Sequence, residues 1–172
     1  YLFPDTYIFP EQATGELIVN ELLKNFGEKA EPAITAGLAA RELSFHELVT
    51  LASIVEEEGR TEADRKNISD VFRKRLAIGQ ALQSDATINY IHGTAKDQPT
   101  FEDLKSTSPY NTYVNAGLPP GPIGNPGLMS INAALYPTAN PYFYFLIDLE
   151  TRITYFAEDF DGHQRNRTTY GL

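Results

Sequence analysis

The segment "SPYNTYVNAGLPPGPIGNPG", residues 108–127, limits most strongly what this chain of 172 residues can fold into. It holds five of the 11 prolines and four of the 12 glycines. Proline removes a backbone donor and clashes with the preceding helical turn, and clustered glycine marks turns and loops. The segment therefore cannot form a long helix, and we expect it to separate regular elements before it from others after it.

Helical patterns precede this segment. The stretch "TGELIVNELLKNFGEKA" has apolar residues near helical spacing, with Thr14 as its N-cap. The stretch "LSFHELVTLASIVEEEG" begins with a capping box of Ser44 and Glu47, and Gly59 stands where the helix should end. A second box-like start from Thr61 to Asp64 opens a helix that Gly79 ends. Residues 44–79 therefore predict two consecutive helices joined by a sharp turn.

Strand patterns follow the Pro- and Gly-rich segment. We expect a short helix from Ser130 and then two strands, "YFYFLID" and "TRITYFAED", paired as a hairpin around residues 149–151. The first ten residues, "YLFPDTYIFP", contain two prolines and predict an edge strand or an extended loop. Helices first and strands last indicate an α+β fold, organised as a single domain over residues 1–172.

Composition excludes several classes of function. The net charge of −9 and a pI of about 4.8 make nucleic acid and anionic lipid surfaces poor partners. The one dense basic run, Arg73 to Arg75, is typical of a solvated helix face. With no cysteine, the chain has no disulfide, thiolate nucleophile or Cys-ligated zinc. The sequence "EDFDGH" resembles the start of a calcium loop but lacks the remaining ligand spacing, so we expect no metal site.

Three adjacent carboxylates, Glu56, Glu57 and Glu58, end the second predicted helix in "LASIVEEEGR". On a helical wheel of about 100° per residue, Glu57 falls on the polar side with Thr50 and Ser53. Glu56 and Glu58 fall on the two flanks of the apolar sector. Burial beside apolar groups penalises a charged carboxylate and raises its pKa, which suits a general acid. The wheel thus leaves Glu56 and Glu58 as candidates, although ordinary surface charge is an alternative for all three.

Four motifs occur in the order found in one known family: "YLFPDTY", "ASIVEEE", "LQSDATINY" and "SPYNTYVNAGLPPGPIGNPG". In this respect the chain resembles the MltG (YceG-like) family of bacterial endolytic murein transglycosylases, from Tyr1 to about Phe145. The ending "TYFAEDFDGHQRN" resembles the family's terminal strand and its histidine more loosely. Relatives often carry Lys at the position of Glu57, Pro at that of Ala86, and a different sequence near Tyr90 to Gly93.

The resemblance implies an activity and assigns residues to it. It implies cleavage of the β-1,4 bond between N-acetylmuramic acid and N-acetylglucosamine within glycan strands, with no cofactor. Glu56 matches the family's catalytic acid and Glu58 a second acid of the pattern. One carboxyl gives its proton to the glycosidic oxygen and then takes the proton of the muramyl C6 hydroxyl, which leaves a 1,6-anhydro end. The exchange of Lys for Glu57 should push the pKa of Glu56 upward.

A saccharide site combines aromatic faces with amides and hydroxyls. The expected substrate-binding residues are Gln83, Ser84, Asp85, Tyr110, Asn111, Thr112 and Tyr113. Core packing is an alternative for the two tyrosines. Asp85 has two further interpretations: it caps the turn that follows, or it is the second acid of a hydrolytic enzyme.

Three other functions compete with lytic cleavage. A hydrolytic muramidase needs a paired acid, for which Asp85 or Glu58 is the candidate. A non-catalytic scaffold would bind peptidoglycan and recruit the cell-wall synthesis machinery. A pyridoxal-phosphate lyase needs a buried Schiff-base lysine, whereas the lysines here lie on polar helix faces or in loops.

The chain shows no stretch of transmembrane length and does not begin with Met. We expect it to be part of a longer protein, with an N-terminal membrane anchor and a LysM-like region before Tyr1. The expected location is extracytoplasmic, facing the periplasm or the cell wall. The expected partners are peptidoglycan glycan strands and peptidoglycan synthases.

Overall fold

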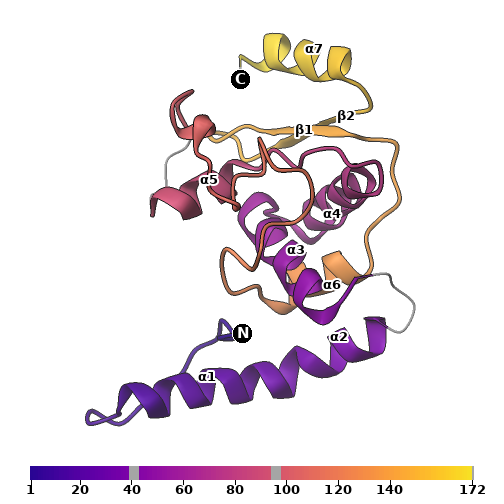
Figure 1. Ribbon diagram of the computed structural model, residues 1–172. Coiled ribbons are helices and arrows are strands. Elements are labelled where there is room, and N and C mark those ends of the chain that lie inside the picture. The colour runs from indigo at the N-terminus through magenta and orange to yellow at the C-terminus, as the bar shows by residue number, and fades with distance from the viewer. Residues whose placement is uncertain (39–42, 94–97, 172) are drawn as a thin grey trace.

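The computed structural model describes residues 1–38, 43–93 and 98–171 (Figure 1). Three helices form the middle of the molecule: α3 (Phe45–Glu58), α4 (Glu62–Ala77) and α6 (Leu128–Leu135). Each packs against the other two. Their apolar side chains form the core, in which Leu51, Ile54, Phe72 and Ile131 are fully buried. None of the helices in these described ranges is both long and apolar enough to cross a bilayer.

The predicted ends of α3 and α4 are confirmed. The Ser44 hydroxyl accepts a hydrogen bond from the Glu47 backbone N–H, and the Glu47 carboxylate accepts one from the Ser44 N–H at 2.8 Å. Thr61 and Asp64 form the same reciprocal box at the start of α4. Gly59 lies in the turn between the helices. A side chain does not fit there, because a Cβ would lie 2.3 Å from Arg65 Cγ. Glycine at this position lets the two helices approach closely.

The expectation that Thr50 and Ser53 lie on a polar face of α3 is wrong, because every residue from Leu48 to Val55 is buried. Thr50 donates to the His46 carbonyl, and Ser53 donates to the Thr50 carbonyl. The Ser53 hydroxyl also accepts a hydrogen bond from the Ile123 backbone N–H at 3.0 Å. The Pro- and Gly-rich segment thus covers this side of α3, which a helical wheel cannot anticipate.

The N-terminal segment is extended and forms no strand, in agreement with the looser of the two predictions. Thr14 caps α1 (Gly15–Lys29), as expected, and α2 (Glu31–Leu38) follows, which was not predicted. Tyr1 packs against Phe26 of α1 and Phe45 of α3, with ring centroids 5.3 and 6.2 Å apart. These contacts join the N-terminal arm to the helical core.

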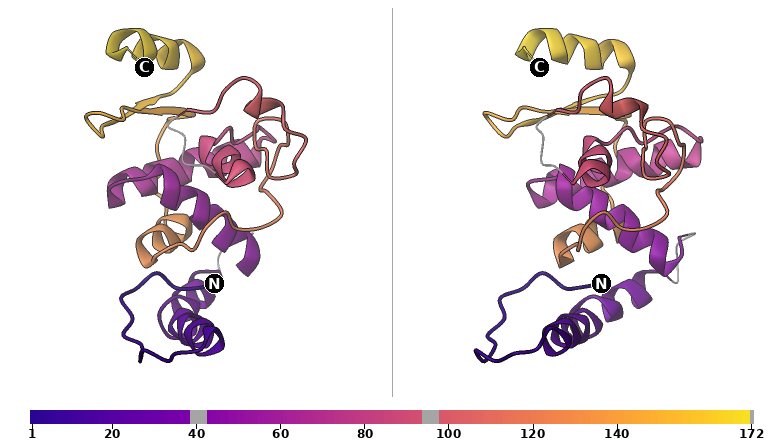
Figure 2. Two further views of the ribbon diagram at one scale, coloured as in Figure 1. Left: turned by 90° about the vertical axis from the view of Figure 1, so that its left-hand side faces the viewer. Right: turned by 60° about the vertical axis from the view of Figure 1, so that its left-hand side comes forward.

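The predicted hairpin is present as β1 (Tyr144–Ile147) and β2 (Thr154–Ala157), with Tyr144 opposite Ala157. The α+β class is therefore confirmed. Strands do not end the chain, however, because α7 (Phe160–Tyr170) follows and packs on both strands. Asp159 caps α7 by accepting the Gly162 N–H at 2.7 Å. Figure 2 shows α7 and α1 at opposite ends of the molecule.

Two short helices differ from expectation. Helix α6 begins at Leu128 rather than Ser130, with Gly127 at the N-cap position. Helix α5 (Asp85–His92), preceded by Ser84, replaces the expected short turn. The residue at the N-cap position of each helix donates a hydrogen bond to a candidate acid: Gly127 to Glu56 and Ser84 to Glu58.

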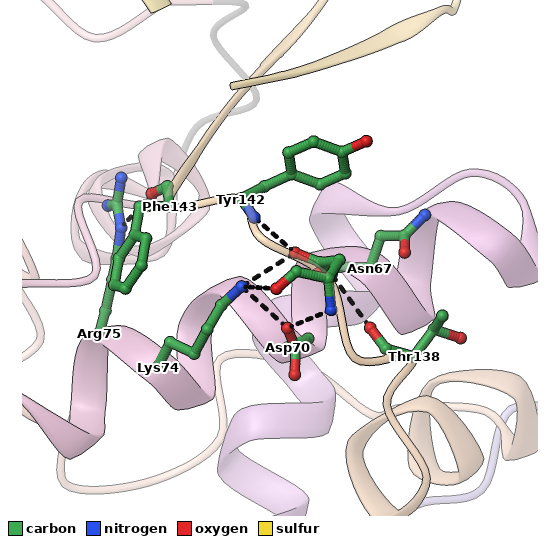
Figure 3. Close-up of polar contacts among 8 residues, drawn as sticks. Asn67, Asp70, Lys74, Arg75, Thr138, Tyr142 and Phe143 are labelled. Carbon is green, nitrogen blue, oxygen red and sulfur yellow. Dashed lines mark hydrogen bonds and ion pairs between the residues drawn. The ribbon is translucent and has the colours of Figure 1, made fainter. Parts of the chain in front are cut away.

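The basic run on α4 is not a solvated face. Lys74 Nζ donates to the Asn140 carbonyl oxygen at 2.6 Å, and the buried Arg75 donates from Nε to the Phe143 carbonyl oxygen at 2.9 Å (Figure 3). Asn140 donates its backbone N–H to Asp70 at 3.1 Å. We call this set of contacts, made by Asn140 and Phe143 to α4, the α4 latch. It fixes the loop before β1 and thereby the position of the hairpin.

Candidate active site

A cleft of about 1470 Å³ lies beside the C-terminal end of α3. Its walls come from α3, α5, the segment around residues 98–104, the hairpin and α7. Three acidic side chains, Glu57, Glu58 and Asp85, lie at one part of the lining, together with Gln83 and Tyr113. The cleft thus gathers side chains from segments that are far apart in the sequence.

Glu58 is the last residue of α3 and faces the N-terminus of α5. Its Oε1 accepts a hydrogen bond from Ser84 Oγ at 2.5 Å, and the backbone N–H of Ala86 is a second donor. Burial, with a smaller contribution from the negative charges of Asp85 and Glu57, outweighs the two hydrogen bonds and raises the pKa of Glu58 to about 7. A carboxyl group with this pKa is protonated in a large fraction of molecules near neutral pH, as general acid catalysis requires.

Asp85 and Tyr113 form a pair next to Glu58. The Tyr113 hydroxyl donates to Asp85 Oδ1. Burial raises the pKa of Asp85, and the Tyr113 hydrogen bond opposes this. Burial, followed by the Asp85 carboxylate, raises the pKa of Tyr113. Tyr113 therefore remains a neutral donor, and Asp85 uses its side chain for this contact rather than for a cap on the chain that follows.

Glu56 has a different environment from Glu58. Its Oε1 accepts a hydrogen bond from Arg65 Nη2 at 2.9 Å, and its Oε2 accepts one from the Gly127 backbone N–H at 3.0 Å. Arg65 is only 9% exposed, and its Nε donates to the Gly59 carbonyl oxygen. Glu56 does not belong to the cleft lining. Its contacts tie α3 to α4 and to the start of α6.

The predicted substrate-binding residues separate into two sets. In the first set, Gln83, Asp85 and Tyr113 line the cleft together with Glu58, and Ser84 donates to Glu58 Oε1. Asn111 is fully buried and donates from Nδ2 to two carbonyl oxygens, those of Leu104 and Ser106.

Thr112 stabilises the backbone next to Glu58 through its contacts with Ser84 and Thr87. It is buried, its Oγ1 accepts the Ser84 N–H at 3.1 Å, and it contacts Thr87 Oγ1 at 2.9 Å. Tyr110 packs against Tyr90 with ring centroids 4.9 Å apart and lies outside the cleft lining.

A family model described as the YceG-like family matches residues 1–169. The chain belongs to the YceG-like family.

Relatives agree with this assignment. An endolytic murein transglycosylase of Bacillus subtilis (strain 168) is 39% identical over 171 residues, which is 99% of this chain and 47% of the relative. A protein of the same name from Streptococcus pneumoniae serotype 2 (strain D39 / NCTC 7466) is 35% identical over 96% of this chain and 31% of the relative. A crystal structure of a YceG-like protein from Listeria monocytogenes superposes with a TM-score of 0.87 at 40% identity, over 96% of this chain and 54% of that one. The chain thus spans about half the length, or less, of these proteins.

This YceG-like domain also brings to the cleft several residues that sequence reasoning did not select. Arg75, Phe101, Tyr144 and His163 line it, from α4, the segment after residue 98, β1 and α7. Tyr90 and Gly93, where the sequence departs from the family pattern, line it as well. The signal available in the sequence was an aromatic residue between polar ones, as at Phe101 between Thr100 and Glu102; in the structure Phe101 is 88% exposed. Among the residues that the structure describes, no three acidic or histidine side chains are grouped as metal ligands.

Proposed function

We propose that this domain is the catalytic part of an endolytic peptidoglycan lytic transglycosylase. It cleaves the β-1,4 bond between N-acetylmuramic acid and N-acetylglucosamine within glycan strands and leaves 1,6-anhydro-N-acetylmuramic acid ends. Glu58 carries this proposal, because it is a carboxyl group with a pKa of about 7 in an open cleft. Family membership and the names of the relatives support the substrate class.

A single carboxyl group suffices for both steps of this reaction. Protonated Glu58 gives its proton to the glycosidic oxygen as the bond to C1 of the muramyl sugar breaks. The Ser84 hydroxyl and the Ala86 N–H then stabilise the carboxylate. The Glu58 carboxylate takes the proton from the C6 hydroxyl, whose oxygen closes on C1. Glu58 ends the cycle protonated, and no water is consumed.

The helical wheel leaves Glu56 and Glu58 as candidates and the family resemblance assigns this proton transfer to Glu56, whereas the geometry favours Glu58. The two oxygens of Glu56 accept hydrogen bonds from Arg65 and Gly127, and Glu56 does not line the cleft, whereas Glu58 does. The assignment to Glu56 stays a prediction that matched variants can decide. Glu56→Gln and Glu58→Gln change the same atoms two positions apart.

The test is mass spectrometry of glycan products after incubation of purified sacculi with wild type and each variant. We expect anhydro ends from wild type and from folded Glu56→Gln. With Glu58→Gln we expect the rate of anhydro-end formation to fall by about a hundredfold or more, because general acid catalysis contributes at least that much to the rate. The reverse pattern would return the role to Glu56. No products from any protein, including the full-length form, would favour a peptidoglycan-binding scaffold.

A hydrolytic muramidase is the second candidate, because Asp85 supplies another carboxyl group in the same cleft. Hydrolysis would give products heavier by one water, with a reducing muramic acid end. The same mass spectra therefore distinguish the two reactions.

For the whole protein we propose an extracytoplasmic location, with an N-terminal membrane anchor and peptidoglycan synthases as partners. The family membership supports this. Labelling of the intact protein by a membrane-impermeant reagent would test the location. Co-purification with glycan-polymerising enzymes would test the partners.

A further inference from the structure

The N-terminus of α5 is built around Glu58 rather than around its own cap. Ser84 stands at the N-cap position, yet its hydroxyl makes no capping hydrogen bond. It donates to Glu58 Oε1 at 2.5 Å instead. The backbone N–H of Ala86, in the first turn of α5, acts on the same carboxyl group. Two donors therefore stabilise the ionised form of Glu58.

Asp85 lies between these two donors and has the opposite effect. Its negative charge repels that of Glu58 and so favours the protonated form of Glu58. Tyr113 donates to Asp85 Oδ1 and stabilises its carboxylate. Glu57, on α3, adds a second negative charge, and Arg75 from α4 acts on Tyr113.

Hydrogen bonds to Thr112 fix the backbone of Gln83 and Ser84, which holds this arrangement. Thr112 accepts the Ser84 N–H and contacts Thr87, and its carbonyl oxygen accepts the Gln83 N–H at 3.0 Å. Gln83 adopts a φ of 54°, a conformation that non-glycine residues rarely occupy. Such strain persists where the surroundings enforce it, and it often marks functional sites. The turn before α5 therefore holds Ser84 and Asp85 in place.

We propose that Asp85, held by Tyr113, is a positioning residue whose negative charge favours the transfer of the C6 hydroxyl proton back to Glu58 in each turnover. The inference rests on the proposed function. After Glu58 has given up its proton, the cleft lining holds two carboxylates, those of Glu58 and Asp85, whose negative charges act on each other. Their repulsion makes the Glu58 carboxylate a better base toward the C6 hydroxyl. Ser84 and Ala86 act in the opposite sense and make the first proton transfer easier. One carboxyl group can thus serve both steps.

The test uses two substitutions that should shift the same titration in opposite directions. Activity requires protonated Glu58, so kcat on purified glycan strands falls as the pH rises through its pKa. Asp85→Asn removes the repelling charge and keeps an oxygen for Tyr113. We expect it to move this limb of the pH profile to lower pH by about one unit. Ser84→Ala removes a donor to the carboxylate, and we expect a shift to higher pH.

Glu57→Gln is the matched control, because it removes an exposed carboxylate that also acts on Glu58. We expect a shift in the same direction as with Asp85→Asn, but smaller, because water screens an exposed charge. Carbon-13 NMR titration of the Glu58 carboxyl group follows the same protonation without turnover.

An unmoved midpoint in Asp85→Asn, or shifts of the same sign in Asp85→Asn and Ser84→Ala, would overturn the role of Asp85 even if wild type cleaves glycans. A different result is that the NMR titration midpoints of Asp85→Asn and Ser84→Ala shift in opposite directions but the wild type cleaves no glycan. That result would overturn the role of Asp85 in turnover together with the proposed function, and would leave only the electrostatic coupling between Asp85 and Glu58.

Discussion

At the scale of single residues, Glu58 should destabilise the folded state above neutral pH. Its pKa is raised from 4.5 to about 7, so the folded state binds this proton more tightly than the unfolded state does. Stability from this group is present below about pH 4.5 and is lost as the pH rises to about 7, by about 3 kcal/mol. Glu58→Gln should therefore raise the free energy of unfolding at pH 8 and change it little at pH 5. Urea unfolding at both values measures this.

Glu56→Gln is the control, and it should lower the free energy of unfolding rather than raise it. The substitution removes the carboxylate that pairs with Arg65, whose guanidinium is almost fully buried. We expect a loss of about 1.5–3 kcal/mol at both pH values, because a hydrogen-bonded charge loses its partner. Equal stability of Glu58→Gln and wild type at pH 8 would mean that the Glu58 carboxylate is well solvated.

The comparison of these two residues shows what a helical wheel can predict. It correctly places Glu57 on the exposed side and leaves Glu56 and Glu58 on the two flanks. What separates them is the chemistry opposite each flank: Arg65 of α4 faces Glu56, and the N-terminus of α5 faces Glu58. Those partners lie nine and 26 residues away, so the choice depends on tertiary packing.

At the scale of elements, Gly59 sets the distance between α3 and α4. An alanine Cβ would meet Arg65 Cγ at 2.3 Å and the Arg65 Cα at 2.9 Å, so backbone as well as side chain must move. Gly59→Ala should lower the free energy of unfolding by about 1–3 kcal/mol through overpacking. Gly15→Ala is the control, because no atom lies within 4 Å of its Cβ position at the start of α1. Thermal unfolding of both variants checks this, and equal melting temperatures would contradict it.

The elements predicted best are those with local end signals. Ser44 with Glu47, and Thr61 with Asp64, define their helices through contacts three residues apart, and the structure reproduces both. Helix α7 was missed although Asp159 and Gly171 provide a cap and a left-handed stop, because its sequence is polar and lacks an apolar stripe. Helix α5 was read as a turn, because eight residues give little periodicity.

At the scale of the whole molecule, the cleft exists because the hairpin and α7 are held against the helical core. The sequence predicted the hairpin but not its position. The basic run Arg73 to Arg75, interpreted as a solvated face, supplies the α4 latch instead. Charge runs are usually solvated, and only the packed partner, the Asn140 loop, reveals this exception.

Asn140→Ala should therefore loosen one wall of the cleft. Its side chain accepts hydrogen bonds from Lys74 Nζ at 2.9 Å and from the Tyr142 N–H, and it donates to the Asn67 carbonyl oxygen (Figure 3). We expect the free energy of unfolding to fall by about 1–3 kcal/mol. KM for glycan strands should rise more than kcat falls, because Tyr144 and His163 belong to the loosened wall while Glu58 does not.

Hydrogen exchange distinguishes this latch from a general loss of stability. In Asn140→Ala, backbone amides of residues 144–170 should exchange faster, while those of α3 keep their protection. Asn166→Ala is the control, because Asn166 donates to the Phe156 carbonyl oxygen within the hairpin and α7 unit and makes no contact that belongs to the α4 latch. It should leave KM near the wild-type value. Faster exchange across α3 and α4 as well would mean that Asn140 stabilises the entire core, and the cleft wall would then have no independent motion to control.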